Sequence, residues 1–312
     1  MGVVVPAYQG LVYMDTSTDS VVSFFGLREP PFAATADPAY FFSTPHHKEC
    51  LFRLWNMIEE RQGTAVVLGG YGTGKTTILR KLLSEMRTDT DTYNTGVIPS
   101  PLPSWTSSLL AENIAHKFMV RLTDSSLVSC MELLSGYLTE NRARVTTLII
   151  DEAQNLNKRG QLELLRLLHN LETRQHKLLN IVCFAQPEWV PILRAVPNFA
   201  DRIHTTVTLK LLSLDELVGL IEFRLGAAGA GADEPVFEED AIRVIHAYSG
   251  GAPRAAVNLC RNVLVLAAQL KTRRIGSAIV MHTIQSATLP DSEKQARVAA
   301  ALRARRPASP QL

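Results

Sequence analysis

Cysteine is scarce in this 312-residue sequence, and its positions exclude two common uses of the residue. The four cysteines lie far apart, with no CxxC pair and no clustered histidines: Cys50, Cys130, Cys183 and Cys260. A structural zinc site or a disulfide framework therefore has no support. The pattern favours buried, reduced thiols in a cytoplasmic protein.

Long apolar runs and an excess of charge of one sign are also lacking. No run reaches the roughly 18–20 apolar residues that a membrane-spanning helix needs. The first residues lack the basic region and long apolar core of a secretory signal. We therefore expect a cytoplasmic chain with no membrane span. The net charge of +2 gives no overall basic signature, so any surface for nucleic acid has to be local.

The most informative stretch is a glycine-rich loop between an apolar run at 65–68 and a helical pattern that starts at Ile78. Strand, glycine loop and helix together form the context in which G-x-x-x-x-G-K-[ST] predicts a phosphate-binding loop. Glycine lets the backbone wrap around a polyphosphate, so that the loop amides and the helix N-terminus point at negative charge. The predicted nucleotide-binding residues are Gly69, Gly70, Tyr71, Gly72, Thr73, Gly74, Lys75, Thr76 and Thr77.

Two side chains of this loop have predicted roles. Lys75 is expected to reach the β- and γ-phosphates, and the Thr76 hydroxyl to ligate Mg²⁺. The alternative is a glycine turn with a chance lysine.

Apolar runs and helical patterns alternate over the first two thirds of the chain. This order predicts an α/β fold with a parallel, five-stranded sheet between two layers of helices. The predicted strands are 65–68, 92–98, 146–150, 179–184 and 205–209. The predicted helices are 46–61, 78–87, 104–122, 127–141 and 160–174.

The strand at 146–150 ends in the acids Asp151 and Glu152. Parallel sheets place ligands at the carboxyl ends of their strands, so two acids here fit the second half of a nucleoside triphosphate site. Asp151 is expected to hold Mg²⁺, and Glu152 to polarise the attacking water. Strands often end in acids, so the two acids alone are weak evidence for a nucleotide site. They become strong evidence because a phosphate-binding loop precedes them by about seventy residues.

After Ser213 the strand patterns stop, and four helical patterns predict an all-helical subdomain: 214–225, 238–248, 253–270 and 277–287. The length also favours about two domains. We predict four parts: an N-terminal extension with an extended docking segment (1–45), a nucleotide-binding domain (46–210), a helical lid (211–290) and a basic, mobile tail (291–312).

With these motifs the chain resembles AAA+ ATPases. Within that class it most resembles the family that contains the ExeA-type secretion ATPases and the TniB/TnsC-type transposition ATPases. The resemblance covers about residues 24–270. The residues that carry it are Phe25-Gly26-Leu27, Pro31-Phe32, Asp37-Pro38, Gly72-Thr73-Gly74-Lys75-Thr76-Thr77, Asp151-Glu152-Ala153-Gln154-Asn155-Leu156, Gln186-Pro187-Glu188, Asp201-Arg202-Ile203, Gly250-Gly251-Ala252-Pro253-Arg254 and Asn258-Leu259-Cys260. It implies ATP with Mg²⁺ as cofactors, ATP hydrolysis, and a homo-oligomeric ring or helical filament.

The resemblance also implies roles for single residues. Gln186 corresponds to the sensor of the γ-phosphate or the water, Arg254 to the lid sensor, and Arg202 to the arginine finger offered to a neighbouring subunit. Arg194 is the second candidate for the finger. The plainer alternatives are a polar loop residue for Gln186 and a surface arginine for Arg202. Ala185 stands where the family usually has glycine.

Three functions remain open. The first is a transposition regulator that oligomerises on duplex DNA and recruits a transposase or target-selection protein; the resemblance makes Lys117 and Arg121 the candidate DNA contacts. No base-reading motif is visible, so we expect little sequence preference. The second is a secretion ATPase that drives assembly of an envelope complex, and the third a scaffold with nucleotide as a clamp. Secretion members of the family continue into a membrane helix, whereas this sequence ends in a basic, Ala-rich segment. Basic residues favour contact with a phosphate backbone, so we expect the first function. The alternative is a solvated tail that binds no partner.

Overall fold

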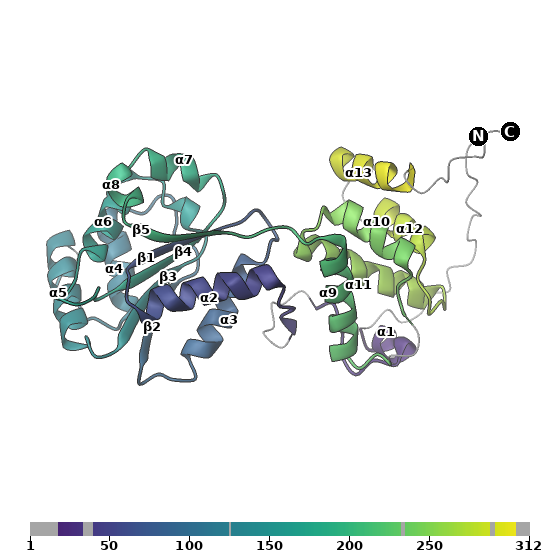
Figure 1. The fold of residues 1–312 in the computed structure, drawn as a ribbon, viewed down its shortest axis with the longest axis horizontal. Coiled ribbons are helices and arrows are strands. Elements are labelled where there is room, and N and C mark those ends of the chain that lie inside the picture. Colours follow the sequence, from purple (N-terminus) through teal and green to yellow (C-terminus); the bar gives the residue numbers. More distant parts are fainter. Residues whose placement is uncertain (1–17, 34–39, 125, 232–234, 288–290, 304–312) are drawn as a thin grey trace. The chain divides into compact units, whose positions relative to one another are not determined.

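The computed structural model describes residues 18–33, 40–124, 126–231, 235–287 and 291–303. The chain divides into two compact units (Figure 1). One consists of Met1–Thr35 and Leu211–Leu312, and the other of Ala36–Lys210. We call them the helical unit and the sheet unit. No helix among the described residues is long and apolar enough to cross a membrane.

The sheet unit contains five parallel strands in the order β2-β3-β4-β1-β5. Their bounds are β1 Thr64–Leu68, β2 Tyr93–Ile98, β3 Val145–Ile150, β4 Asn180–Ala185 and β5 Ile203–Thr208. Because β4 lies between β1 and β3, the loops after these three strands meet at one edge of the sheet. The predicted strands are confirmed to within two residues at each end.

Helices cover both faces of this sheet (Figure 1). Alternate residues of β1 point to opposite faces: Ala65 and Val67 pack with α2 Pro45–Glu59 and α3 Lys75–Met86, whereas Val66 packs with the helices of the other face. Those helices are α4 Ser107–Lys117, α5 Leu127–Glu140, α6 Arg159–His169, α7 Trp189–Arg194 and α8 Pro197–Ala200. The predicted three-layer architecture is therefore confirmed. The short helices α7 and α8 were not predicted.

The described residues of the helical unit form helices and connecting segments without a named strand. The helices are α1 Thr18–Phe25, α9 Leu214–Ala227, α10 Glu239–Ser249, α11 Pro253–Gln269, α12 Ser277–Ala287 and α13 Ser292–Arg303. A C-terminal helical region is thus confirmed, and α1 and α13 extend it beyond the predicted lid.

The N-terminal segment agrees in part with the predicted docking segment, because residues 26–33 form no helix or strand. It contains the helix α1, and the residues after it pack within the helical unit. Leu27 and Phe32 are buried there, and the ring of Phe32 makes an edge contact with Phe237 at 6.1 Å between centroids. The aromatic residues that suggested an extended strip are anchors of this packing. Residues 1–17 of the predicted extension lie outside the described residues.

Residues 292–303 of the predicted mobile tail form the helix α13, which packs against α10. Val298 is only 3% exposed. Arg297 donates to the backbone oxygens of Ala247 (3.2 Å) and Tyr248 (3.3 Å), and Lys294 lies 5.2 Å from the ring centroid of Tyr248. These basic side chains therefore bind a neighbouring helix, which charge counting alone does not anticipate. Residues 304–312 lie outside the described part of the chain.

The predicted helix at 104–122 is shorter in the structure. Its N-cap is Thr106, whose hydroxyl accepts from the amide of Leu109 at 3.2 Å, and it ends at Lys117. Met119 then takes a left-handed φ of 58°, which stops helical hydrogen bonding before 122. Likewise α6 ends at His169 and not at the predicted 174.

His169 packs at the base of the sheet and makes stability depend on pH. Its Nδ1 lies 2.9 Å from the Thr64 hydroxyl, and a side chain at Gly63 would overlap its ring. Burial, followed by the nearby cations Lys177 and Arg202, lowers the pKa of His169 from 6.5 to about 4. The unfolded chain binds a proton near pH 6.5 and the folded chain only near pH 4, so stability falls as the pH drops through this window.

We therefore expect the sheet unit to lose about 2–3 kcal/mol of unfolding free energy between pH 7 and pH 4 from this residue. His169→Gln should have a flatter pH dependence, although it is less stable at pH 7. All three tryptophans lie in the sheet unit, so their fluorescence in urea reports its unfolding: Trp55, Trp105 and Trp189. The exposed His282 gives the control variant His282→Asn, and equal pH slopes for wild type and His169→Gln would contradict the assignment.

Candidate nucleotide site

The glycine loop after β1 is closed by its own hydrogen bonds. The Gly69 amide donates to the Ala185 oxygen at 3.0 Å, which ties the loop to the end of β4. The Thr73 hydroxyl donates to the Gly70 oxygen at 2.9 Å. A side chain at Gly69 would lie 2.5 Å from that hydroxyl, so the close turn requires glycine. Gly74 takes a φ of 100°, a conformation that favours glycine as well.

Lys75 places its ammonium group inside this loop. Nζ donates to the oxygens of Gly69 (2.7 Å) and Gly70 (3.1 Å), and the side chain is buried. Lys75 is also the first residue of α3, a 12-residue helix whose N-cap Gly74 offers no side-chain cap. The amides of a helix N-terminus and a buried cation converge here, which is the arrangement that binds phosphate.

The acids after β3 lie next to the loop. The Thr76 hydroxyl donates to Asp151 Oδ2 at 3.4 Å, and the Glu152 amide donates to Asp151 Oδ1 at 2.9 Å. Burial raises the pKa of Asp151, while the bond from the Glu152 amide lowers it. A hydroxyl and a carboxylate are hard oxygen donors, so Thr76 and Asp151 fit Mg²⁺, which takes few protein ligands and keeps several waters.

Glu152 is held by two amide side chains. Its Oε2 accepts from Gln186 Nε2 at 3.3 Å and from Gln154 Nε2. The backbone N–H of Gln186 in turn donates to Gln154 Oε1 at 3.1 Å. Glu152 has a left-handed φ of 52°, uncommon for this residue and typical of constrained sites. The structure thus places the predicted residue Gln186 beside Glu152.

Gln154 was not predicted as a site residue, although it lies in the stretch that carries the family resemblance. Its side chain links the segment after β3 to the segment after β4. Its position two residues after Glu152 is the sequence feature that could have indicated it. In the structure it lies on the short helix η2 Ala153–Asn155. Ala185, which replaces the family's usual glycine, is buried and ends β4, where its oxygen accepts from the Gly69 amide.

The three predicted arginines are all exposed. Arg202 is exposed before β5 and lines an open pocket of about 430 Å³ with Arg166, Asn198 and Asp201. Arg194 is exposed at the end of α7. Arg254 is exposed in the first turn of α11, in the helical unit. Within the sheet unit, neither Arg194 nor Arg202 joins the hydrogen-bonded group around Glu152. The finger and lid-sensor roles stay predictions.

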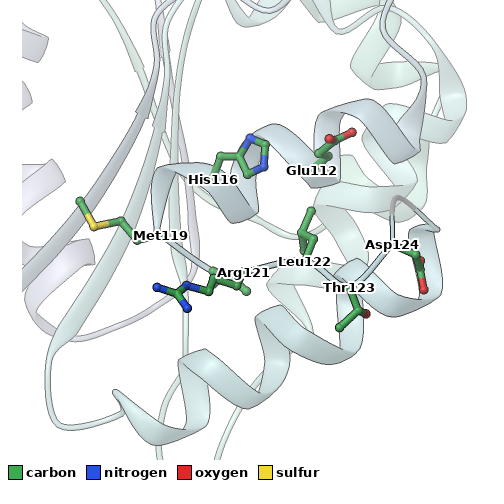
Figure 2. Close-up of a pocket in the computed structure, with 8 residues that line it drawn as sticks. Glu112, His116, Met119, Arg121, Leu122, Thr123 and Asp124 are labelled. Carbon is green, nitrogen blue, oxygen red and sulfur yellow. The ribbon is translucent and has the colours of Figure 1, made fainter.

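The candidate DNA contacts lie around the end of α4: Lys117 is its last residue, and Arg121 follows in the loop that Figure 2 shows. A cavity of about 500 Å³ is lined by Glu112, His116, Met119, Val120, Arg121, Leu122, Thr123 and Asp124. Arg121 therefore lines it, and Lys117 does not. Both side chains are exposed, and Met119 between them is 90% exposed. Two acids share this rim with the basic residues, so the local charge is mixed.

The sheet order, the glycine loop and the acids after β3 together define a protein with the P-loop AAA+ fold. Residues 58–193 match a family model described as an AAA domain. The chain is 35% identical over 249 residues to General secretion pathway protein A of Aeromonas hydrophila. This match covers 78% of the chain and 44% of the relative, so the chain spans less than half the length of that protein.

Two solved structures show the same fold at low sequence identity. A structure of Drosophila ORC bound to DNA has a TM-score of 0.66 at 17% identity, covering 95% of this chain and 73% of that one. A structure of the Aeropyrum pernix ORC2 protein in ADPNP-ADP complexes has a TM-score of 0.59 at 14% identity, covering 82% and 73%. The fold and these matches support an AAA+ ATPase.

Proposed function

We propose that this chain binds ATP with Mg²⁺ and hydrolyses it to ADP and phosphate. The observation that carries the proposal is one hydrogen-bonded group at adjacent strand ends, which joins the phosphate loop to Asp151, Glu152 and Gln186. The buried Lys75 and the amides of α3 bind the phosphates. Thr76 and Asp151 hold Mg²⁺, which neutralises charge on the phosphates.

Glu152 is the group that orients and polarises the attacking water in this mechanism. Two amide donors, from Gln154 and Gln186, restrict its carboxylate to one side of the site. Gln186 is therefore the residue through which a change at the γ-phosphate reaches Glu152. Positioning of this kind supplies most of the catalysis in phosphoryl transfer, because the protein forms no covalent intermediate.

Lys75→Ala tests the binding half of the proposal. Removing the buried ammonium is expected to weaken ATP binding by about tenfold or more, because no other predicted site residue supplies a cation inside the loop. Titration of a fluorescent ATP analogue with Mg²⁺ measures this, and Lys81→Ala, on the same helix α3, is the control. Equal affinities for wild type and Lys75→Ala would refute the assigned loop.

For the cellular role, we propose a part in a general secretion pathway, with ATP turnover driving assembly of an envelope complex. The similarity to General secretion pathway protein A over 78% of this chain supports it. This role takes precedence over the transposition role that was expected from the basic C-terminal segment. Two of the basic residues that favoured that role, Lys294 and Arg297, lie against α10.

The second candidate is the transposition regulator, a homo-oligomer on duplex DNA with a transposase or target-selection partner. The exposed Lys117 and Arg121 beside the protruding Met119 favour it, because cations beside an apolar tip can contact a phosphate backbone. ATPase rate and particle size by light scattering, each with and without duplex DNA, separate the two roles. Large assemblies that need both DNA and ATP, and that shrink in Lys117→Ala/Arg121→Ala, would favour transposition. No response to DNA would favour secretion.

A further inference from the structure

His47, at the start of α2, has a fixed orientation. Its own amide donates to the Thr44 hydroxyl at 3.2 Å, and its Nδ1 accepts from the Thr44 amide at 3.4 Å. This reciprocal pair is a capping box in which histidine takes the place of the usual Glu or Gln. His47 is 7% exposed and Thr44 2%, and the ring of Phe41 lies 5.7 Å away. Burial and the hydrogen bond to Nδ1 leave the imidazole little freedom.

The far edge of this ring faces the phosphate loop. A side chain atom placed at Gly74 would lie 3.8 Å from His47 Nε2, and apart from Gly74 and its two chain neighbours no other described residue comes within 4 Å of that position. Gly74 is the left-handed residue just before Lys75. Because Nδ1 accepts a hydrogen bond, the neutral ring carries its proton on Nε2, as assigned from this hydrogen-bond pattern. An N–H dipole is therefore held beside the turn that starts α3.

We propose that His47 is a positioning residue for nucleotide, which stabilises the phosphate-filled form of the loop through Nε2. The imidazole occupies the side of Gly74 toward which a side chain would project, and so favours glycine and the left-handed turn that aims the α3 amides. Its N–H dipole also adds to the positive end of that helix. His47 further links the loop to residues 41–44 of the sheet unit. The proposal rests on nucleotide binding as proposed above.

Two amide variants separate this role from plain helix capping. Asn matches the Nδ1 side of imidazole and Gln matches the Nε2 side. His47→Asn keeps the cap and loses the atom beside Gly74, whereas His47→Gln places a donor near Gly74 and loses the Nδ1 geometry. We expect His47→Asn to weaken binding of a fluorescent ATP analogue about fivefold, and His47→Gln less than twofold. The maximal ATPase rate at saturating ATP should change less than the affinity in both.

The opposite order, with His47→Asn like wild type and His47→Gln weaker, would assign His47 to capping alone and overturn the proposal. Equal losses in both would do the same. His46→Asn is the control, because His46 bonds the Thr208 oxygen at 2.8 Å at the end of β5. If the wild type binds no ATP and Lys75→Ala behaves identically, the proposed nucleotide function is refuted. If the wild type binds ATP and His47→Asn binds it equally well, only the role of His47 is refuted.

A measurement on the wild-type chain covers the case in which the variants do not fold. Histidine ring signals in ¹⁵N NMR report the tautomer of each imidazole. We expect His47 to carry its proton on Nε2, and its signals to move when ATP and Mg²⁺ are added, with smaller changes at His282. An Nδ1-protonated ring, or a His47 signal that ATP does not move, would overturn the proposal.

Discussion

Glu152→Gln is expected to slow ATP hydrolysis by about 10²–10⁴-fold while ATP affinity stays within about twofold of wild type. Glutamine keeps the size of the side chain and can still bond Gln154 and Gln186, so the loop and the Mg²⁺ ligands keep their geometry. What is lost is the negative charge that polarises water. Steady-state phosphate release and titration of a fluorescent ATP analogue measure the two quantities.

The matched control is Glu188→Gln, which removes a carboxylate from the exposed turn just after Gln186. It should hydrolyse ATP like wild type. A Glu152→Gln protein that keeps more than about a third of the wild-type rate would show that another group activates the water. Because ATP is bound and not consumed, Glu152→Gln is also the variant in which ATP-dependent assemblies should accumulate.

The parts of this site that the sequence predicts well are those fixed by local chain order. A glycine loop between a buried strand and a helix has few ways to fold, so Lys75 and Thr76 are placed without knowledge of the rest. The prediction that Asp151 and Glu152 lie at the same site required one further rule, that parallel strands end at a common edge of the sheet. The strand β4, which inserts between β1 and β3, then brings Gln186 to Glu152.

The parts that were missed depend on contacts between distant segments. Gln154 matters through two hydrogen bonds to Glu152 and Gln186, and it has no spacing pattern of its own. The basic residues of 292–303 suggested a mobile tail, but Arg297 and Lys294 bind α10 and turn the segment into a helix. The helix α4 ends early because Met119 takes a left-handed conformation. Methionine rarely takes this conformation, so the sequence does not predict it.

Arg202→Ala is expected to lower ATPase activity by about 10³-fold or more with ATP binding unchanged, if Arg202 is the finger that a neighbouring subunit offers. Arg202 is exposed, lines an open pocket and lies outside the group around Glu152, as a residue acting in trans requires. Arg194→Ala tests the second candidate, and Arg174→Ala, another exposed arginine of the sheet unit, is the control. Rates are measured at protein concentrations at which the particle size no longer rises.

A mixing experiment then decides whether the site is shared between subunits. Glu152→Gln supplies an intact finger and Arg202→Ala an intact acid, so a mixed assembly forms some complete sites from two inactive variants. In a head-to-tail assembly with random mixing, about a quarter of the interfaces pair an intact acid with an intact finger. We therefore expect an equal mixture to recover about a quarter of the wild-type rate. If Arg194→Ala, and not Arg202→Ala, is inactive alone, then recovery in its mixture with Glu152→Gln would move the finger to α7. No recovery from two inactive variants would mean that each subunit completes its own site.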